Sequence, residues 1–182
     1  QIELVAPADP KRTQFHGGDS WSYGAARVAG SEGLDPDEPY RWRIDLHHNQ
    51  HSHPVLVDKV ATGGTFAIDA KDHGDVWNIW FRFYLTTRTE TCQEFTIYQE
   101  LFPAFSLLTV DSVPRPVAIA IDGAPHPTEY RRKLIVGMEQ TLEAPKQIVM
   151  QGAVGTFDHW HIFGSGWPVE AAAESENRLE PK

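Results

Sequence analysis

The chain has 182 residues, of which 41% are apolar and 11% aromatic, and a formal net charge of −9. This composition is that of a globular protein with a sizeable core. The acidic balance argues against nucleic acid as a partner, because nucleic-acid binding needs a clustered basic surface. No run of about 18 apolar residues is present, so no membrane span is predicted. A single cysteine, Cys92, rules out an internal disulfide, zinc ribbons, iron–sulfur centres and covalently attached haem, and we expect neither a haem nor a nucleotide.

Period-two alternation of apolar and polar residues dominates the first part of the chain and predicts β-strands. In the first clear strand Trp42, Ile44 and Leu46 share one face, while the intervening polar residues share the other. A long aromatic strand is predicted over residues 76–85 and a further strand over 93–101. Cys92 adjoins this last strand, so we expect a buried structural thiol in a strand interior.

The pattern restarts after residues 101–103, with strands predicted over 105–110, 117–121, 132–136 and 147–150 and a turn at Asp122-Gly123. We therefore predict an all-β protein with an antiparallel β-sandwich over residues 1–102 and a smaller β module over 103–168. Residues 169–182 are charged and poor in large apolar side chains. This tail is predicted to be disordered or a frayed helix.

Histidines are concentrated just after the first clear strand, where His47, His48, His51 and His53 make up four of the nine in the chain. Alternation places His48 on the apolar face of the strand and His47 on the opposite face. A turn at Asn49-Gln50 would bring His51 and His53 back beside one of them.

These histidines, with Asp45 as a further ligand or supporting carboxylate, suit zinc or copper. Two other interpretations stay open: a hydrogen-bonded network that holds an irregular loop, and contact with carbohydrate. His159 and His161, on one face of a presumed strand, form a second candidate pair of metal ligands.

Aromatic side chains form a separate candidate site. Trp80 and Tyr84 lie on the face of the long strand opposite its apolar side chains, and with Trp21, Tyr23 or Trp167 they can form a platform on which sugar rings stack. The alternative is that these rings pack against the second module or another chain. Acidic turn residues such as Asp35 offer oxygen ligands for calcium, but no contiguous calcium-loop motif is present, so calcium is less favoured than copper or zinc.

Residues 42–54 resemble a "W-x-V-D-x-H-H-x-x-H-x-H-P" signature of PKD-like β-sandwich modules that are appended to secreted bacterial pyrroloquinoline-quinone-dependent sugar dehydrogenases of the glucose/sorbosone type. Residues 117–123 and 137–147 resemble the "G-L-x-L-x-L-D-G" and "G-x-x-x-x-L-x-A-P-x-x-Q" motifs of the small β module that often follows. The resemblance covers roughly residues 1–165. It departs after Trp160, where the usual "S-D-G-G" is missing, and the dehydrogenase propeller itself is absent.

The resemblance therefore implies an immunoglobulin/PKD-like β-sandwich followed by a smaller β module, with an accessory role, and not the dehydrogenase chemistry. The expected function is that of a non-catalytic binding module of a secreted or periplasmic protein, which contacts a polysaccharide or another extracellular protein. The chain opens directly on Gln1-Ile2-Glu3-Leu4-Val5 without a signal peptide, so we expect a mature N-terminus or a piece of a longer chain. Two alternatives remain: a copper- or zinc-dependent extracellular enzyme centred on the histidines, and a structural subunit that assembles with copies of itself.

Overall fold

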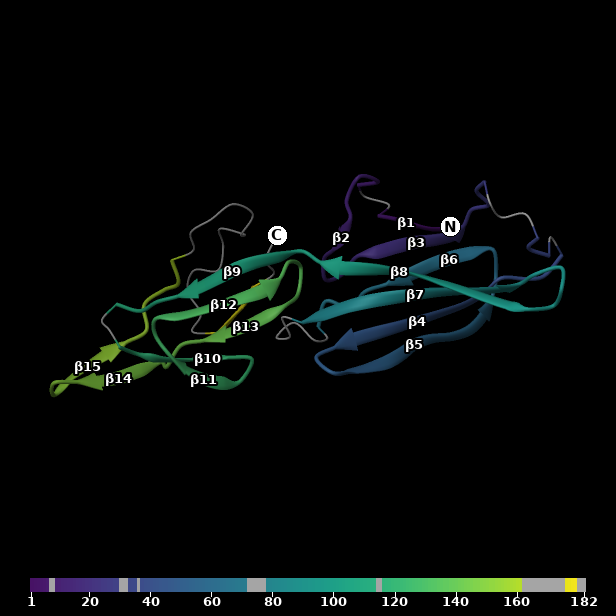
Figure 1. The fold of residues 1–182 in the computed structure, drawn as a ribbon. Coiled ribbons are helices and arrows are strands. Elements are labelled where there is room, and N and C mark those ends of the chain that lie inside the picture. The colour runs from purple at the N-terminus through teal and green to yellow at the C-terminus, as the bar shows by residue number, and fades with distance from the viewer. Residues whose placement is uncertain are drawn as a thin grey trace. The chain divides into compact units, whose positions relative to one another are not determined.

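The computed structural model describes residues 1–6, 9–29, 33–35, 37–71, 78–113 and 116–161, and the backbone of 176–179. All regular secondary structure in these ranges is β-strand (Figure 1), which confirms the all-β prediction. The described residues contain no helix with the length and apolar character needed to cross a membrane. The chain divides into two compact units, one made of Gln1–Ile68 and Asn78–Ala104, the other of Asp69–Trp77 and Phe105–Lys182. The first unit thus ends two residues beyond the boundary expected from the sequence.

The first unit contains two sheets. A three-stranded antiparallel sheet has the order β1-β3-β6 and consists of β1 (Ile2–Val5), β3 (Ser20–Ala25) and β6 (Gly63–Ala67). A five-stranded sheet has the order β2-β8-β7-β4-β5 and consists of β2 (Gln14–Phe15), β4 (Arg41–His48), β5 (His51–Val60), β7 (Ile79–Arg88) and β8 (Glu94–Pro103). Only β2 runs parallel to its neighbour.

Aromatic rings from both sheets meet to form the core of the first unit. Tyr23 of the three-stranded sheet lies 4.8 Å from Trp42, and Phe66 lies 4.8 Å from Phe81, measured between ring centroids. Trp42 and Phe81 come from apolar faces that the alternation predicted, whereas the inward positions of Tyr23 and Phe66 were not predicted. Trp42 and Phe83 are fully buried. Two sheets that share one aromatic core have the architecture of a β-sandwich.

Strand β5 lies at the edge of the five-stranded sheet and was not predicted as a strand. Its side chains are almost all exposed, so the strand lacks the apolar alternation on which sequence-based prediction depends. Pro54 lies within it, and Asp58 has a φ of 47°. An edge strand tolerates a proline, and both features disfavour the addition of another strand from a neighbouring chain.

The second unit contains three further sheets. Its four-stranded sheet has the order β11-β10-β13-β16 and consists of β10 (Ala118–Ile121), β11 (Ala124–Pro127), β13 (Gln140–Glu143) and β16 (Glu176–Leu179). The two-stranded sheets pair β9 (Phe105–Val110) with β12 (Tyr130–Ile135) and β14 (Gln147–Met150) with β15 (Ala153–Thr156). The core of this unit contains buried apolar side chains from β9, β10, β12 and β13: Leu108, Val110, Ile119, Ile121, Leu134 and Leu142.

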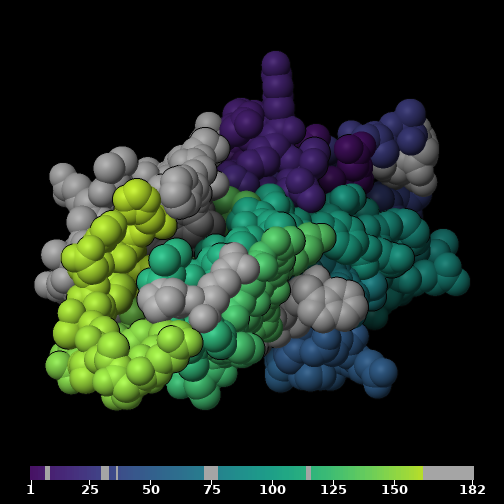
Figure 2. All heavy atoms as spheres, turned by 90° about the vertical axis from the view of Figure 1, so that its left-hand side faces the viewer, coloured from purple at the N-terminus to yellow at the C-terminus, as the bar shows by residue number. Residues whose placement is uncertain are grey.

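The strands predicted in the second unit are present within a few residues of their expected bounds. The Asp122-Gly123 turn joins β10 to β11 with a positive φ at both residues. The tail was expected to be disordered or a frayed helix, but Glu176–Leu179 forms strand β16 and pairs with β13. Residues 169–175 and 180–182 lie outside the described residues. The β14–β15 hairpin, yellow-green in Figure 2, lies at the surface of this unit and exposes Val149 and Val154.

Candidate metal centre

Three histidines meet on the hairpin formed by β4 and β5. Strand β4 ends at His48 and β5 begins at His51, so these two residues are the last pair of the antiparallel ladder. His53 lies two residues further along β5 and therefore shares the face of His51. Asn49, in the intervening turn, has a φ of 53°, a left-handed conformation that asparagine adopts more readily than most residues. The local sequence thus places three imidazoles on one face of one hairpin.

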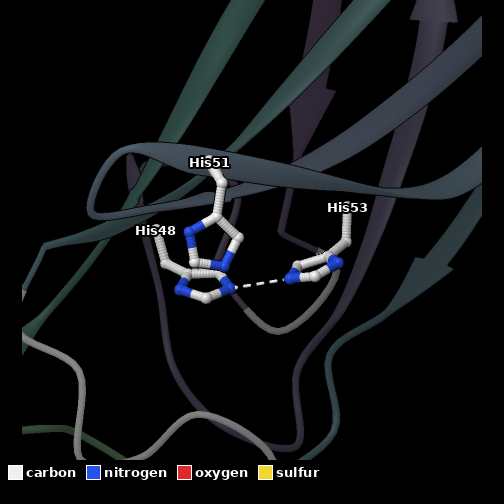
Figure 3. Close-up of side chains that lie close together, drawn as sticks. All are labelled: His48, His51 and His53. Atoms are coloured by element: carbon white, nitrogen blue, oxygen red, sulfur yellow. Dashed lines mark hydrogen bonds between the residues drawn. The ribbon is translucent and has the colours of Figure 1, made fainter.

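The rings of these three residues, called the histidine triad below, are in mutual contact. The Nε2 atoms of His48 and His53 lie 2.9 Å apart, and the ring centroids of His48 and His51 lie 3.9 Å apart. One ring nitrogen of each residue lies within 4.8 Å of the others. Figure 3 shows the rings gathered on one side of the hairpin. Within the described ranges, no other group of three or more histidine, cysteine or acidic side chains is close enough to share a metal ion.

The spacing of the triad suits a tetrahedral ion. Zinc binds imidazole nitrogen at about 2.0 Å, which places two tetrahedral ligand nitrogens roughly 3.3 Å apart. The Nε2 atoms of His48 and His53 lie 2.9 Å apart, and no separation in the triad exceeds 4.8 Å, a range that includes the spacing a tetrahedral ion requires. An ion between the Nε2 atoms of His48 and His53 would replace their hydrogen bond. His48 is the most buried of the three rings, and the other two are exposed.

His47 lies on the opposite face of the sheet from the triad, as the alternation predicted, and does not take part in it. Its ring stacks on Trp80 of the neighbouring strand, with centroids 5.0 Å apart and planes at 11°. Burial lowers the pKa of the His47 imidazole, and the nearby positive charge of Arg82 lowers it further. His47 therefore belongs to an aromatic stack on the other face, and the expectation that it belongs to the metal cluster is corrected.

Asp45 also lies on that opposite face and does not support the triad. Its carboxylate is buried and accepts two hydrogen bonds from the Arg43 guanidinium, at 2.8 and 2.7 Å. This bidentate ion pair raises the pKa of Arg43. Since strand alternation sends residues 45 and 48 to opposite faces, Asp45 acts as a structural partner of arginine and not as a ligand beside the imidazoles.

The second histidine pair lies in the other unit, on a stretch without regular structure where a strand was expected. The rings of His159 and His161 contact each other edge to face, with centroids 5.0 Å apart. The Nδ1 atom of His159 lies 2.8 Å from the Asp158 carboxylate. The pair is thus brought together, but in the described ranges it does not belong to a group of three potential ligands.

In the structure, the described side chains of the predicted aromatic platform lie in different environments. Trp80 and Tyr84 lie on the outward face of β7 and are half-buried. Trp21, in contrast, packs into the core of the first unit and is 1% exposed, so it cannot offer a ring to a ligand. Its alternation with Tyr23 along β3 marks a core face, which the sequence interpretation overlooked. Trp167 lies outside the described residues.

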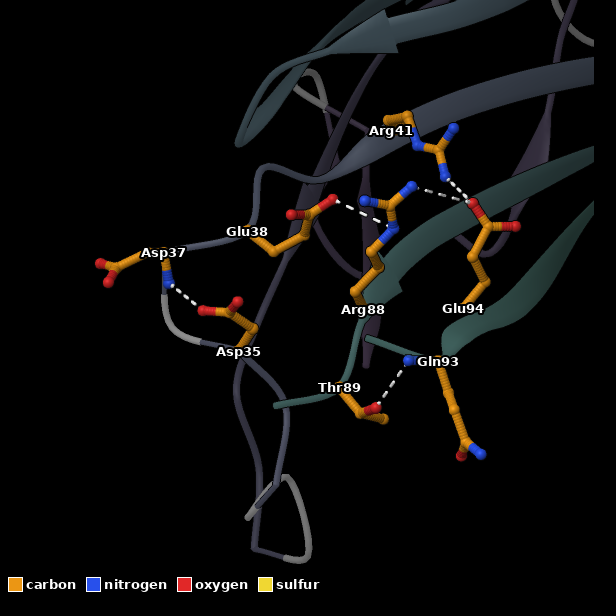
Figure 4. Close-up of polar contacts among 8 residues, drawn as sticks. All are labelled: Asp35, Asp37, Glu38, Arg41, Arg88, Thr89, Gln93 and Glu94. Atoms are coloured by element: carbon orange, nitrogen blue, oxygen red, sulfur yellow. Dashed lines mark hydrogen bonds and ion pairs between the residues drawn. The ribbon is translucent and has the colours of Figure 1, made fainter. Parts of the chain in front are cut away.

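The acidic turn before β4 joins a polar network with the end of the β7–β8 hairpin (Figure 4). Asp35 accepts a hydrogen bond from the backbone nitrogen of Asp37, while Glu38 faces Arg88 at 3.7 Å. Arg88 also approaches Glu94, which pairs with Arg41. The carboxylates of Glu38 and Glu94 therefore have cationic partners.

Cys92 was expected as a buried thiol in a strand, and the structure corrects this. It lies in the turn between β7 and β8 with a φ of 62°, and its side chain is exposed. The turn is held by a hydrogen bond from the Cys92 backbone nitrogen to the Thr89 carbonyl. The residues on both sides of the turn have a strand-like pattern, so the sequence did not indicate a turn at residue 92.

No protein-family model, curated protein or solved structure matches the chain.

Proposed function

We propose that this chain is a non-catalytic binding module that holds one divalent transition-metal ion, zinc or copper, with His48, His51 and His53. The observation that carries the proposal is the convergence of one nitrogen from each of three imidazoles to within 4.8 Å on a single hairpin. Neutral imidazole is a good ligand for both ions. A secreted or periplasmic location and an accessory role beside a larger extracellular protein remain part of this proposal.

The position of the triad supports a binding or structural role over catalysis. A hydrolytic zinc site combines an open coordination position with a positioned general base and a site that excludes bulk water. Here two of the three rings are exposed, and the nearby carboxylate of Asp45 is committed to Arg43 on the other face of the sheet. A bound ion would instead clip β4 to β5 at the end of an exposed edge hairpin.

Metal titration tests the proposal. The chain is purified without a chelator or nickel affinity step, and zinc and copper(II) are each titrated by calorimetry in a buffer that competes weakly for metal. We expect one equivalent to bind, and affinity to fall as the pH is lowered, because protons compete with the metal for imidazole nitrogens. A double variant, His51→Ala/His53→Ala, is expected to lose stoichiometric binding.

A matched double variant in the other unit, His159→Ala/His161→Ala, is the control and is expected to bind like the parent chain. The competing interpretation is a hydrogen-bonded network without metal. It predicts no stoichiometric binding by the parent chain, together with a loss of stability in the His51→Ala/His53→Ala variant under metal-free conditions. That pair of results would refute the metal site and leave the network as the role of the triad.

A further inference from the structure

The outward face of the five-stranded sheet carries a second cluster of polar and aromatic side chains, separate from the triad. Cross-strand pairing of β4, β7 and β8 aligns these side chains in rows, so that Asp45, Arg82 and Glu100 form one row and Arg43, Tyr84 and Tyr98 the next. The residues of this outer face include Arg41, Arg43, Asp45, His47, Trp80, Arg82, Tyr84, Thr86, Arg88, Glu94, Thr96, Tyr98, Glu100 and Phe102.

Two tyrosines at the middle of the outer face offer aromatic surface. Tyr84 and Tyr98 are cross-strand partners whose ring centroids lie 6.2 Å apart. The Arg82 guanidinium lies over the Tyr98 ring at 4.7 Å from its centroid, which holds the ring in place. Tyr98 is nevertheless 60% exposed. A fixed and exposed ring loses little side-chain freedom when a ligand stacks on it.

The charges of the outer face are paired with one another. Arg43 pairs with Asp45 at 2.7 Å and Arg82 pairs with Glu100 at 2.6 Å. The third pair joins Arg41 to Glu94 (Figure 4). A face on which each of these arginines already has a carboxylate offers no unpaired guanidinium among them to an acidic ligand. It still offers hydrogen-bond donors and acceptors, because paired guanidinium and carboxylate groups keep further bonding positions.

A depression of about 310 Å³ opens on the outer face beside Tyr84. The Thr86 and Thr96 hydroxyls, which lie 2.9 Å apart, are among its lining groups. The remaining lining residues are Arg41, Trp42, Arg43, Asp58 and Glu94. Hydroxyl, guanidinium and carboxylate groups around an aromatic wall are the groups that bind the hydroxyls and the apolar C–H face of a sugar ring.

We propose that the outer face binds a neutral saccharide chain, with one sugar ring stacked on Tyr98 and a neighbouring ring in the depression beside Tyr84. The balanced charges favour a neutral sugar over an acidic one. The prominence of polar groups around the depression favours a sugar over a protein surface, whose buried interface core is depleted in charge. This site is distinct from the metal site, since the triad occupies the opposite face of β4 and β5, and the proposal does not depend on a bound ion.

Binding to defined polysaccharides tests the proposal. The chain is incubated with insoluble cellulose, xylan and mannan and titrated with soluble dextran and glucomannan, with acidic alginate as a comparison. We expect saturable binding to at least one neutral polysaccharide, and weaker binding to alginate. Binding is expected to be unchanged by a metal chelator, which separates this result from the outcome of the metal titration.

The matched variants are Tyr98→Ala and Phe95→Ala, which remove exposed aromatic rings from opposite faces of the same strand. We expect Tyr98→Ala to weaken binding by about tenfold and Phe95→Ala to leave it unchanged. Glu94→Gln provides a variant that keeps the shape of the depression and removes one acceptor charge, and it is expected to weaken binding severalfold. Thermal unfolding of each variant checks that the fold is retained.

Three results would overturn the proposal: no binding to any neutral polysaccharide, binding to alginate alone, or equal losses in Tyr98→Ala and Phe95→Ala. Binding to alginate alone would point to an ionic ligand, and failure with every polysaccharide would favour a protein surface as the partner of this face.

Discussion

Residues 47–53 and residues 158–161 both contain neighbouring histidines, but the backbone conformation differs between the two segments. In the first, a hairpin with a fixed register brings His48, His51 and His53 onto one face. In the second, His159 and His161 lie on a stretch without strand pairing, and their rings contact each other beside the Asp158 carboxylate. The difference shows that paired strands, and not the density of histidines alone, assemble a three-ligand site.

The largest expected effect is the difference in zinc affinity between variants that lose a histidine from the first segment and from the second. Replacing His48 alone by alanine removes the most buried ring of the triad and is expected to weaken zinc binding by at least about 100-fold, since two ligands then remain. Replacing His159 by alanine is expected to leave zinc affinity within error of the parent. Calorimetric titration of both variants makes the comparison, and a greater loss in the His159→Ala variant would reverse the assignment.

Asp45→Ala tests whether the two faces of β4 have separate roles. This change leaves Arg43 without its bidentate partner and removes charge-assisted hydrogen bonds at a buried carboxylate. We expect the free energy of unfolding to fall by about 2 kcal/mol, with zinc affinity unchanged. Urea unfolding and metal titration of the same sample measure both quantities. Should zinc affinity fall as well, Asp45 would support the triad despite its position on the other face.

The turn of the hairpin offers a smaller effect. Asn49→Val places a β-branched residue at a φ of 53°, a conformation that such residues adopt only at a cost. We expect stability to fall by about 1 kcal/mol and zinc affinity by severalfold, because the ladder that positions His48 and His51 is loosened. Asn49→Gly, which permits the same φ, is the control and should retain both properties. Equal behaviour of the two variants would show that the turn does not position the triad.

The smallest expected effect concerns His47. Its folded-state pKa is lowered, so the unfolded chain binds a proton more readily than the folded chain. The resulting contribution to stability is fully present above the ordinary imidazole pKa of about 6.5 and is lost as the pH falls through and below it. His47→Phe keeps an aromatic ring against Trp80 and removes the titration. The free energy of unfolding should therefore fall less in the variant than in the parent chain between neutral and acidic pH. Part of the fall should remain, because the pKa of His16 is also lowered.

Much of the fold follows from alternation along the chain. Strands whose inward residues are large and apolar, such as Ile79–Arg88, are predictable because burial imposes a period of two. Strand β5 is not, because an exposed edge strand requires no apolar face, and Pro54 within it is typical of a strand end or a loop. The opposite faces of His47 and His48 are predictable from the same period.

The membership of the site could be predicted only in part. The Asn49-Gln50 turn correctly indicated that His51 and His53 fold back onto the strand. The exclusion of Asp45 was available from the same alternation, which places residues 45 and 48 on opposite faces. Its bidentate pairing with Arg43 was not, because residue type alone does not distinguish a ligand from an ion-pair partner. Tyr98 was missed, although the alternation of Glu94, Thr96, Tyr98 and Glu100 places them on one face of a strand.

X-ray absorption at the zinc edge of the chain loaded with one equivalent tests the metal site most directly, because it reports the ligands of the ion itself. Three imidazole nitrogens at about 2.0 Å, with the imidazole scattering reduced in His51→Ala, would agree with the site assigned to the triad. A zinc ion with one imidazole or none, or a spectrum unchanged by His51→Ala, would contradict it.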